Sequence, residues 1–213
     1  MGSIVDLSTS LRCLKHLFVK IRSKDCQLTE FKRYADRIMS LIVEEGLSHI
    51  QCMRECVVQT PTGCDYNGCT FNPEDLVLIS IIRAGDSMLD IAMKVVPEAS
   101  VGKILIQRNE VTAKPILYYS KLPHLQSKTI IVLDPMLATG GSAKTAIDVL
   151  LSLGASEENM LFFCVVSCPE GVRNLTTNFP KLTLVTGEVD ERLNEKKYII
   201  PGLGDYGDRY YGT

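Results

Sequence analysis

Residues Thr129–Thr145 read TIIVLDPMLATGGSAKT and hold a strand, an acidic side chain, a glycine pair and the start of a helix. The run TIIVL is short, apolar and β-branched, which is typical of a strand covered on both faces of a sheet. Asp134 follows it directly, and a helical pattern runs from about Gly141 to Gly154. A buried strand that leads through a polar turn into a helix predicts an α/β unit.

Strands and helices alternate on both sides of this unit, which predicts a mostly parallel, twisted sheet with helices on both faces. Turn residues inside 55–71 also predict a hairpin arm that protrudes before the main sheet. For the first amphipathic helix, Thr29 is the expected N-cap and Gly46 the expected stop. The expected strands are 76–82, 101–108, 114–122, 129–134, 160–167 and 182–189, and the expected helices are 29–45, 84–96, 141–153 and one from about Pro169.

Length and charge limit the classes of protein. A chain of 213 residues suits one domain, which we place at residues 28–213 behind an N-terminal extension of residues 1–27. The net charge of −2, with Lys and Arg scattered along the sequence, argues against a nucleic-acid partner or an anionic membrane surface. With no long apolar run and no secretory leader, a cytoplasmic protein is expected.

The eight cysteines are expected to be free, buried thiols. Four of them fall within residues 52–69, but their spacing lacks the paired C-x2-C pattern of a zinc site. Without a secretory context, disulfides are not expected either. The three histidines lie far apart in the sequence and form no catalytic or metal-binding pattern.

The glycine turn Thr139–Ser142 is the main candidate binding element. Adjacent glycines let backbone approach a ligand, and the free N–H groups of a helix start favour an anion such as a phosphate monoester. The stretch lacks the four-residue spacer of a Walker A loop. The alternative is an ordinary turn with Ser142 as N-cap. Asp134 at the strand end favours a ribose phosphate, because its carboxylate can accept hydrogen bonds from vicinal hydroxyls.

Asp134–Ser142, DPMLATGGS, resembles the loop of type I phosphoribosyltransferases that binds 5-phosphoribosyl 1-diphosphate (PRPP), in the form found in uracil phosphoribosyltransferases. Most of that superfamily has two consecutive acids where this chain has Asp-Pro. Further matches follow in order over about residues 28–213. They are RAG (83–85, the pyrophosphate loop), QRNE (107–110), YYSKLP (118–123, the flexible arm), PEGV (169–172) and the C-terminal stretch 193–213.

The resemblance implies a type I phosphoribosyltransferase-like fold with a C-terminal hood over the base site, and it implies the site residues. Arg108 and Asp205 are the expected catalytic residues, and Mg²⁺ is expected on PRPP oxygens with no direct protein ligand. The residues expected to bind uracil are Ile199, Gly204, Asp205 and Tyr206. Those expected to bind PRPP are Arg83, Arg108, Asp134, Pro135, Met136, Leu137, Ala138, Thr139, Gly140, Gly141, Ser142 and Asp205.

The implied reaction transfers the 5-phosphoribosyl group of PRPP to N1 of uracil and gives UMP and pyrophosphate, a step of pyrimidine salvage. A homodimer or homotetramer and a possible GTP effector are implied as well. Asp86 departs from many relatives, since an acid beside pyrophosphate would repel it unless the side chain faces away or lies near Mg²⁺.

Three other functions stay open on the sequence. A purine or orotate phosphoribosyltransferase is one, and a PRPP-sensing or RNA-binding regulator on the same scaffold is another. The third is an NAD-dependent oxidoreductase, because Gly202–Gly207, GLGDYG, spells the dinucleotide fingerprint G-x-G-x-x-G. That fingerprint needs a helix after it, and the six residues Asp208–Thr213 are too few for a useful one.

Overall fold

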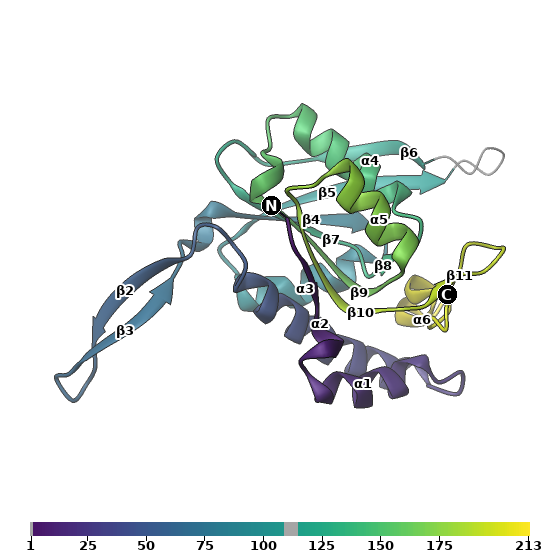
Figure 1. Ribbon diagram of the computed structural model, residues 1–213, viewed down its shortest axis with the longest axis horizontal. Coiled ribbons are helices and arrows are strands. Elements are labelled where there is room, and N and C mark those ends of the chain that lie inside the picture. The colour runs from purple at the N-terminus through teal and green to yellow at the C-terminus, as the bar shows by residue number, and fades with distance from the viewer. Residues whose placement is uncertain (1, 109–114) are drawn as a thin grey trace.

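The computed structural model describes residues 2–108 and 115–213, and its centre is an eight-stranded sheet (Figure 1). The strand order is β1-β10-β9-β7-β4-β5-β6, with β8 alongside β9. β6 is antiparallel to β5, whereas the other paired strands described in this sheet are parallel. The strands are β1 Ile4–Asp6, β4 Leu76–Ile82, β5 Ser100–Arg108, β6 Pro115–Lys121, β7 Thr129–Leu133, β8 Met136–Leu137, β9 Met160–Ser167 and β10 Thr183–Val189.

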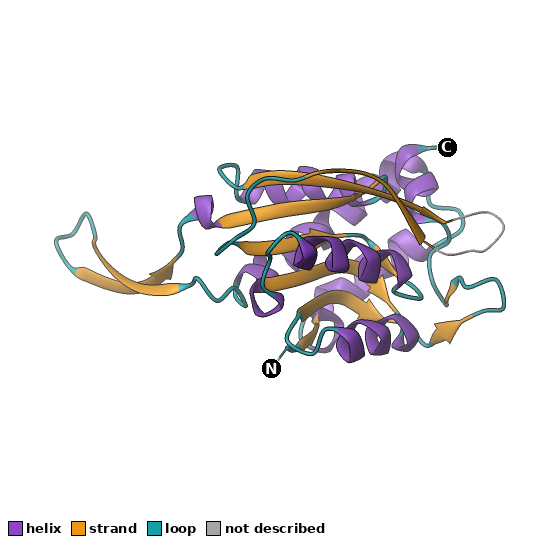
Figure 2. Ribbon diagram, turned by 90° about the horizontal axis from the view of Figure 1, so that it is seen from above, coloured by secondary structure: helices purple, strands orange, loops and turns teal. Residues whose placement is uncertain are grey.

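Helices cover both faces of the sheet (Figure 2). Side chains along β9 alternate between two apolar cores: Phe163 packs with α1, α2 and α3, and Phe162 packs with α4 and α5. Coverage on both faces explains the uninterrupted apolar strands, and it confirms the predicted α/β class. The helices are α1 Arg12–Arg22, α2 Leu28–Leu47, α3 Gly85–Val95, α4 Gly141–Ser152, α5 Pro169–Asn178 and α6 Tyr206–Tyr211, with 3₁₀ turns at Leu7–Thr9, Pro73–Asp75 and Glu157–Asn159.

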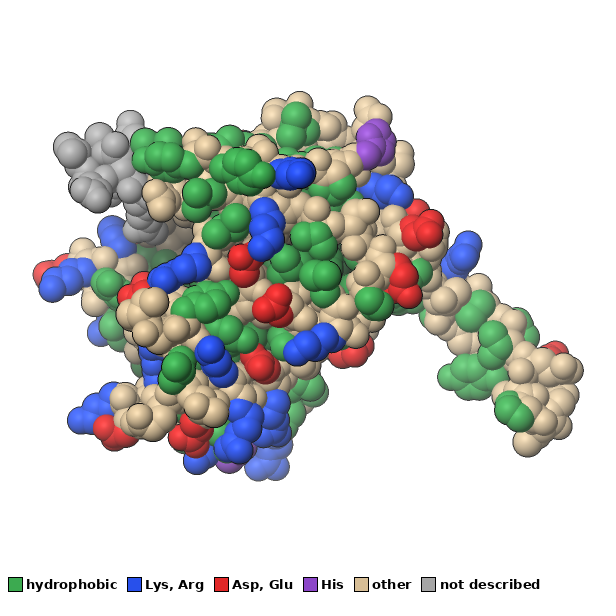
Figure 3. Space-filling model, turned by 180° about the vertical axis from the view of Figure 1, so that it is seen from behind, with side chains coloured by type: hydrophobic (Ala, Val, Ile, Leu, Met, Phe, Trp, Pro, Cys, Tyr) green, Lys and Arg blue, Asp and Glu red, His purple; other side chains and the backbone are tan. Residues whose placement is uncertain are grey.

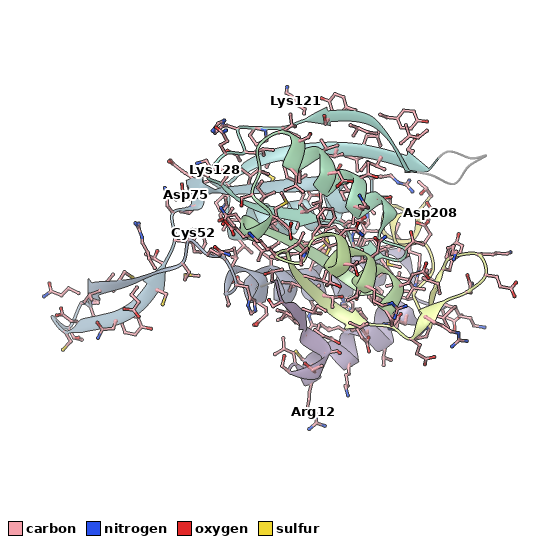
Figure 4. All side chains as sticks on the ribbon, turned by 45° about the horizontal axis from the view of Figure 1, so that its top comes forward. Arg12, Cys52, Asp75, Lys121, Lys128 and Asp208 are labelled. Atoms are coloured by element: carbon pink, nitrogen blue, oxygen red, sulfur yellow. The ribbon has the colours of Figure 1, made fainter. Side chains whose placement is uncertain are left out.

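The predicted hairpin arm is present as β2 Arg54–Gln59 and β3 Asp65–Thr70, which pair antiparallel and project from the body of the molecule (Figure 1). Its turn is closed by a hydrogen bond from the Thr60 amide to the Cys64 carbonyl, 2.8 Å. Gly63 in this turn has φ +81°, a conformation that glycine adopts without strain. At the root of the arm, Lys128 and Asp75 lie 3.6 Å apart (Figure 4).

The predicted ends of the first amphipathic helix are wrong. The N-cap of α2 is Gln27, with no side-chain capping bond, and Thr29 lies inside the first turn. The helix also continues through Gly46 to Leu47. Gly46 is buried there, and a Cβ at this position would collide with the ring of Phe163 in β9. This glycine lets α2 approach the sheet closely.

Residues 2–27 pack with the rest of the chain, which differs from the expectation of an extension. β1 is an edge strand of the main sheet and pairs with β10. The spacing of Leu14, Leu17, Phe18 and Ile21 puts them on one face of α1, where they are buried in the core shared with α2. The N-terminal segment therefore supplies both sheet hydrogen bonds and core side chains.

Basic side chains that are scattered in the sequence gather on the outer side of α1 and α2, as seen at the lower edge of Figure 3. The Tyr34 ring has Lys20, Arg33 and Arg37 at 5.8, 4.9 and 5.7 Å from its centroid. Lys and Arg that are scattered along the sequence are thus clustered on this surface, because two helices bring them together. In the described part of the chain, no helix has the length and apolar character needed to cross a membrane.

All eight cysteines lie in the described part of the chain and are free thiols there. Cys164 and Cys168 are buried, as expected for small apolar side chains of a core. The expectation of burial is wrong for Cys13, Cys64 and Cys69, which are exposed. Two of these three lie on the projecting arm, which has no core of its own.

Candidate active site

The polar segments singled out in the sequence follow three adjacent strands, β7, β4 and β5. Arg83 follows β4, Arg108 ends β5, and Asp134 follows β7. Because these strands are parallel, their carboxyl ends meet at one edge of the sheet, where ligands of such folds bind. The side chain of Arg108 lies outside the described part of the structure.

The glycine turn forms a small cup between β8 and α4. Gly140 is the N-cap of α4 with φ +79°, and its carbonyl accepts the first helical bond from the Lys144 amide at 2.8 Å. The Thr139 hydroxyl accepts a 3.4 Å hydrogen bond from the Gly141 amide. The cup has a cavity volume of about 40 Å³. Its lining consists of Asp134, Met136, Leu137, Ala138, Thr139, Gly140, Gly141, Ser142 and Ala143.

Helix α5 supports this cup from behind. The Cys168 thiol donates to the Ala138 carbonyl at 3.1 Å, and the Asn174 side chain donates to the Thr139 carbonyl at 2.7 Å. Gly171 lies so close that an added Cβ would come within 2.5 Å of the Ala138 oxygen. The PEGV stretch, which begins α5, therefore helps to position the cup through backbone contacts. The carbonyl oxygens of the cup face α5, so that its N–H groups can face a ligand.

A larger cavity of about 480 Å³ opens beside the cup. Met136 and Ala138 line both cavities, so one continuous loop borders the two sites. The volume lies within the usual range for a small-molecule site. The residues that line it are Arg83, Ala84, Met136, Ala138, Lys196, Lys197, Tyr198, Ile199, Gly204, Asp205, Tyr206 and Gly207.

The far wall of this cavity is the hood, which comprises residues 192–213. It contains the antiparallel strands β11 Arg192–Leu193 and β12 Ile199–Ile200, followed by α6. The Asp205 carboxylate caps α6 by accepting from the Asp208 amide at 2.9 Å. The expectation of too few residues for a helix is wrong to this extent, since α6 begins at Tyr206. At six residues, and preceded by a two-residue strand, β12, that lies outside the main sheet, α6 does not make a dinucleotide site.

The Tyr206 side chain points away from the cavity and into the core. It is 1% exposed, its hydroxyl lies 3.3 Å from the Met39 sulfur, and its ring packs edge-on against Phe31 with centroids 5.4 Å apart. Burial raises the pKa of this phenol well above its ordinary value, so it stays neutral. The side chain anchors the hood on α2 and leaves the main chain of Tyr206 at the cavity.

Arg83 is held by the C-terminal residues. Its guanidinium donates to the Asp208 carboxylate at 2.6 Å and to the Thr213 hydroxyl at 3.0 Å. The hydrogen bond from Arg83 lowers the pKa of Asp208 below its usual value, with a further contribution from Thr213. Both side chains of the pair are about half exposed, so the link itself adds little stability. Asp208 lies on the opposite side of the molecule from the hairpin arm (Figure 4).

Asp86, the acid next to the RAG segment, is already paired. One carboxylate oxygen accepts from the Ser80 hydroxyl at 2.7 Å, and the other lies 3.0 Å from the Lys103 ammonium. The neighbouring positive charge offsets the repulsion that an acid would exert on a pyrophosphate at this loop. Among the described residues, no group of three His, Cys, Asp or Glu side chains is arranged to hold a metal ion.

Most of the residues expected at the site lie around two adjoining cavities. Asp134 and residues 136–142 line the cup, whereas Pro135 lines neither cavity, and Arg83, Ile199, Gly204, Asp205 and Tyr206 line the larger cavity next to it. Lys196, Lys197 and Tyr198, to which sequence reasoning assigned no binding role, line that cavity as well, together with Ala84 of the RAG segment and Gly207 of the GLGDYG stretch. For Lys196–Tyr198, the pair of short strands around them was the missed signal. The expected flexible arm lies largely in the regular strand β6.

Comparison with known proteins agrees with this geometry. The model of the family described as uracil phosphoribosyltransferase matches residues 8–213. The uracil phosphoribosyltransferase of Dictyostelium discoideum is 48% identical over 201 residues, which is 94% of this chain and 92% of that one. A solved structure of the AQ2163 protein from Aquifex aeolicus has a TM-score of 0.85 at 37% identity, covering 99% of this chain and 98% of the other.

A more distant structure shares the fold alone. Orotate phosphoribosyltransferase from Mycobacterium tuberculosis, solved with PRPP, has a TM-score of 0.52 and 13% identity, covering 85% of this chain and 92% of that one. The family match begins at residue 8, within the segment that the sequence suggested was an extension. The resemblance read from the DPMLATGGS loop and the C-terminal stretch is confirmed.

Proposed function

The chain belongs to the uracil phosphoribosyltransferase family, and from that premise we propose that it transfers the 5-phosphoribosyl group of PRPP to N1 of uracil. The observation that carries the proposal is the loop Met136–Ala138, which borders both a small cup and a base-sized cavity. A phosphate and a base joined to one ribose need two such sites side by side. The products are UMP and pyrophosphate.

In this proposal the 5′-phosphate of PRPP binds in the 138–142 turn. The N–H groups at the start of α4 and the helix dipole favour the dianion there. The Asp134 carboxylate, which lies part-buried at the rim of the cup, accepts hydrogen bonds from the ribose hydroxyls. Arg83 and Arg108 take the pyrophosphate, because guanidinium groups bind phosphate oxygens through paired hydrogen bonds.

Mg²⁺ would be held by PRPP oxygens in this scheme, with no direct protein ligand, because the ion prefers phosphate and water ligands. It would supply positive charge to offset that of the pyrophosphate. The carboxylate of Asp86 is already engaged by Lys103 and Ser80.

The base reacts while it is held against the hood. Main-chain groups of Ile199, Gly204 and Tyr206 hydrogen-bond to uracil, and Asp205 faces the PRPP side. N1 attacks the anomeric carbon as the bond to pyrophosphate breaks, the N1 proton is released, and the carbon inverts through an oxocarbenium-like transition state. Catalysis then depends on holding the two partners in line and on stabilising the departing charge, with no covalent protein intermediate.

The test is incubation of the protein with PRPP, Mg²⁺ and one nucleobase at a time, following pyrophosphate release and nucleotide formation. We expect UMP from uracil and little product from orotate, hypoxanthine or guanine. Turnover of a purine or of orotate in place of uracil would favour the other phosphoribosyltransferases. PRPP binding without any nucleotide product would favour a PRPP-sensing regulator.

Assembly and regulation are part of the same proposal. The hairpin arm exposes Val57, Val58 and Tyr66, with exposed fractions of 62%, 52% and 61%, and such apolar side chains suit a contact between copies of the chain. A homodimer or homotetramer should therefore appear in light scattering after size-exclusion chromatography. GTP as an effector is expected from the family resemblance, and adding GTP to the UMP assay tests it. A cytoplasmic location stays an expectation from the sequence.

A further inference from the structure

The segment that carries the base-reading backbone begins with a glycine turn between β12 and α6. Gly202 and Gly204 have φ of +64° and +84°, a region that other residues rarely adopt. A Cβ at Gly202 would also collide with the Ile199 carbonyl. Glycines give the turn its shape, but they contribute no side chains that could hold it in place.

An ion pair from two distant segments binds this turn. Asp190, which follows β10 and is 5% exposed, accepts from the Gly202 amide at 2.8 Å. Arg22, the last residue of α1, donates to the Gly202 carbonyl at 2.7 Å. The same guanidinium forms two hydrogen bonds with Asp190, of 2.9 and 2.6 Å. Both polar backbone groups of Gly202 are therefore bound by one bidentate pair.

Neighbouring contacts extend the link between α1 and the hood. Arg22 also donates to the Glu188 carboxylate at 2.8 Å. Arg209 of α6 donates to the Leu203 carbonyl and to the Ser23 carbonyl, both at 2.7 Å. The peptide groups of residues 202 and 203 are thus held on the side of the turn that faces α1, while Gly204, Asp205 and Tyr206 border the cavity.

We propose that Arg22 and Asp190 form a positioning pair that sets the place of the Gly204–Tyr206 backbone for uracil. The inference rests on the proposed function, in which this backbone reads the base. Uracil is small, so its binding depends on a few main-chain groups whose positions must be correct within a fraction of an ångström. The pair acts chiefly on the base, because the phosphate cup is built by different segments, β8, α4 and α5, and the hood reaches PRPP only through Asp205 and the contact between Asp208 and Arg83. It also gives the N-terminal segment a role in the site.

The experiment compares Arg22→Lys and Arg22→Met with wild type and with Arg12→Ala. Lysine keeps the positive charge but has a single donor head, so it cannot bind Asp190 and the Gly202 carbonyl as a planar fork does. Methionine keeps part of the apolar stem and leaves Asp190 without its partner. Arg12 is an exposed arginine at the other end of α1 and points away from the molecule, which makes it the matched control (Figure 4).

We expect KM for uracil to rise roughly 10-fold in Arg22→Lys and roughly 100-fold in Arg22→Met, as charged hydrogen bonds are lost. KM for PRPP should stay within about twofold in both variants, and Arg12→Ala should match wild type. PRPP-binding stoichiometry and thermal unfolding report the folded fraction. If Arg22→Met does not fold, Arg22→Lys alone decides the question.

A purely structural role predicts a different pattern, in which the amount of active protein falls while both KM values stay the same. That pattern, or equal rises in both KM values, overturns the positioning pair and leaves the proposed function standing. A wild-type protein that forms no UMP overturns both.

Discussion

Replacing Gly171 with alanine tests whether α5 sets the geometry of the phosphate cup. The new Cβ would lie 2.5 Å from the Ala138 oxygen and 2.7 Å from the Leu137 oxygen. A carbon and a carbonyl oxygen in ordinary contact lie about 3.3 Å apart, so helix and loop must separate by roughly 0.8 Å. Both oxygens belong to backbone, so no side chain can rotate to relieve the contact.

The two consequences have different sizes. Overpacking costs about 1–3 kcal/mol, and the better helix propensity of alanine returns up to about 1 kcal/mol, so the free energy of unfolding falls by roughly 0–3 kcal/mol. A loss of 2 kcal/mol lowers Tm by about 4–8 °C in a domain of this size. The cup, by contrast, moves by close to 1 Å, a displacement that can cost about 100-fold in rate. We therefore expect a folded protein with a severe defect for PRPP.

The assay is kcat/KM for PRPP at saturating uracil, measured beside Tm. The control for PRPP kinetics is Gly63→Ala at the remote tip of the hairpin arm, where an added Cβ meets no atom within 4 Å; because its φ of +81° strains alanine, this variant controls kcat/KM and not Tm. If kcat/KM for PRPP in Gly171→Ala stays within about threefold of wild type, α5 does not set the geometry of the cup, because the cup then tolerates the displacement. A fall in Tm with normal PRPP kinetics would mean that the close contact of Gly171 with the cup contributes to packing alone.

Three further predictions follow from the hood and the core. Asp205→Asn keeps an acceptor for the Asp208 amide and so keeps the N-cap, while kcat should fall at least about 10-fold; an unchanged kcat removes Asp205 from catalysis. Asp208→Asn removes an anion that competes for Arg83, so KM for PRPP should fall about two- to fivefold, and a higher KM would mean that Asp208 chiefly orients Arg83. Burial raises the pKa of Cys164 from 9.0 to about 12, so the unfolded chain loses this proton first and the free energy of unfolding declines as pH rises from 9 toward 12. Between pH 9 and pH 10.5, the free energy of unfolding in urea should fall about 2 kcal/mol less for Cys164→Ala than for wild type. An equal pH dependence in the two proteins would contradict the raised pKa of Cys164.

Local patterns predicted much of the fold and the cup. The strand predicted at 76–82 matches β4 and the one at 160–167 matches β9, because an apolar run bounded by turn residues needs only neighbouring positions to be recognised. The start of α4 at Gly141 was readable for the same reason, since two glycines and a helical pattern stand together. Gly46 shows the limit of this reasoning. Its role depends on Phe163, more than a hundred positions away, and the local pattern suggested a helix end instead.

Local sequence patterns were enough for the class of fold, for the order of the main strands and helices between residues 29 and 189, and for the turn at Thr139–Ser142, because periodicity and residue type act over a few positions. The tertiary structure decided how the N-terminal segment and the hood combine. Arg22 and Asp190 are separated by 168 positions, and neither stands in a recognisable motif. Only the packing of α1 beside the hood brings that pair to Gly202, where a buried carboxylate needs a cation and two backbone groups need partners.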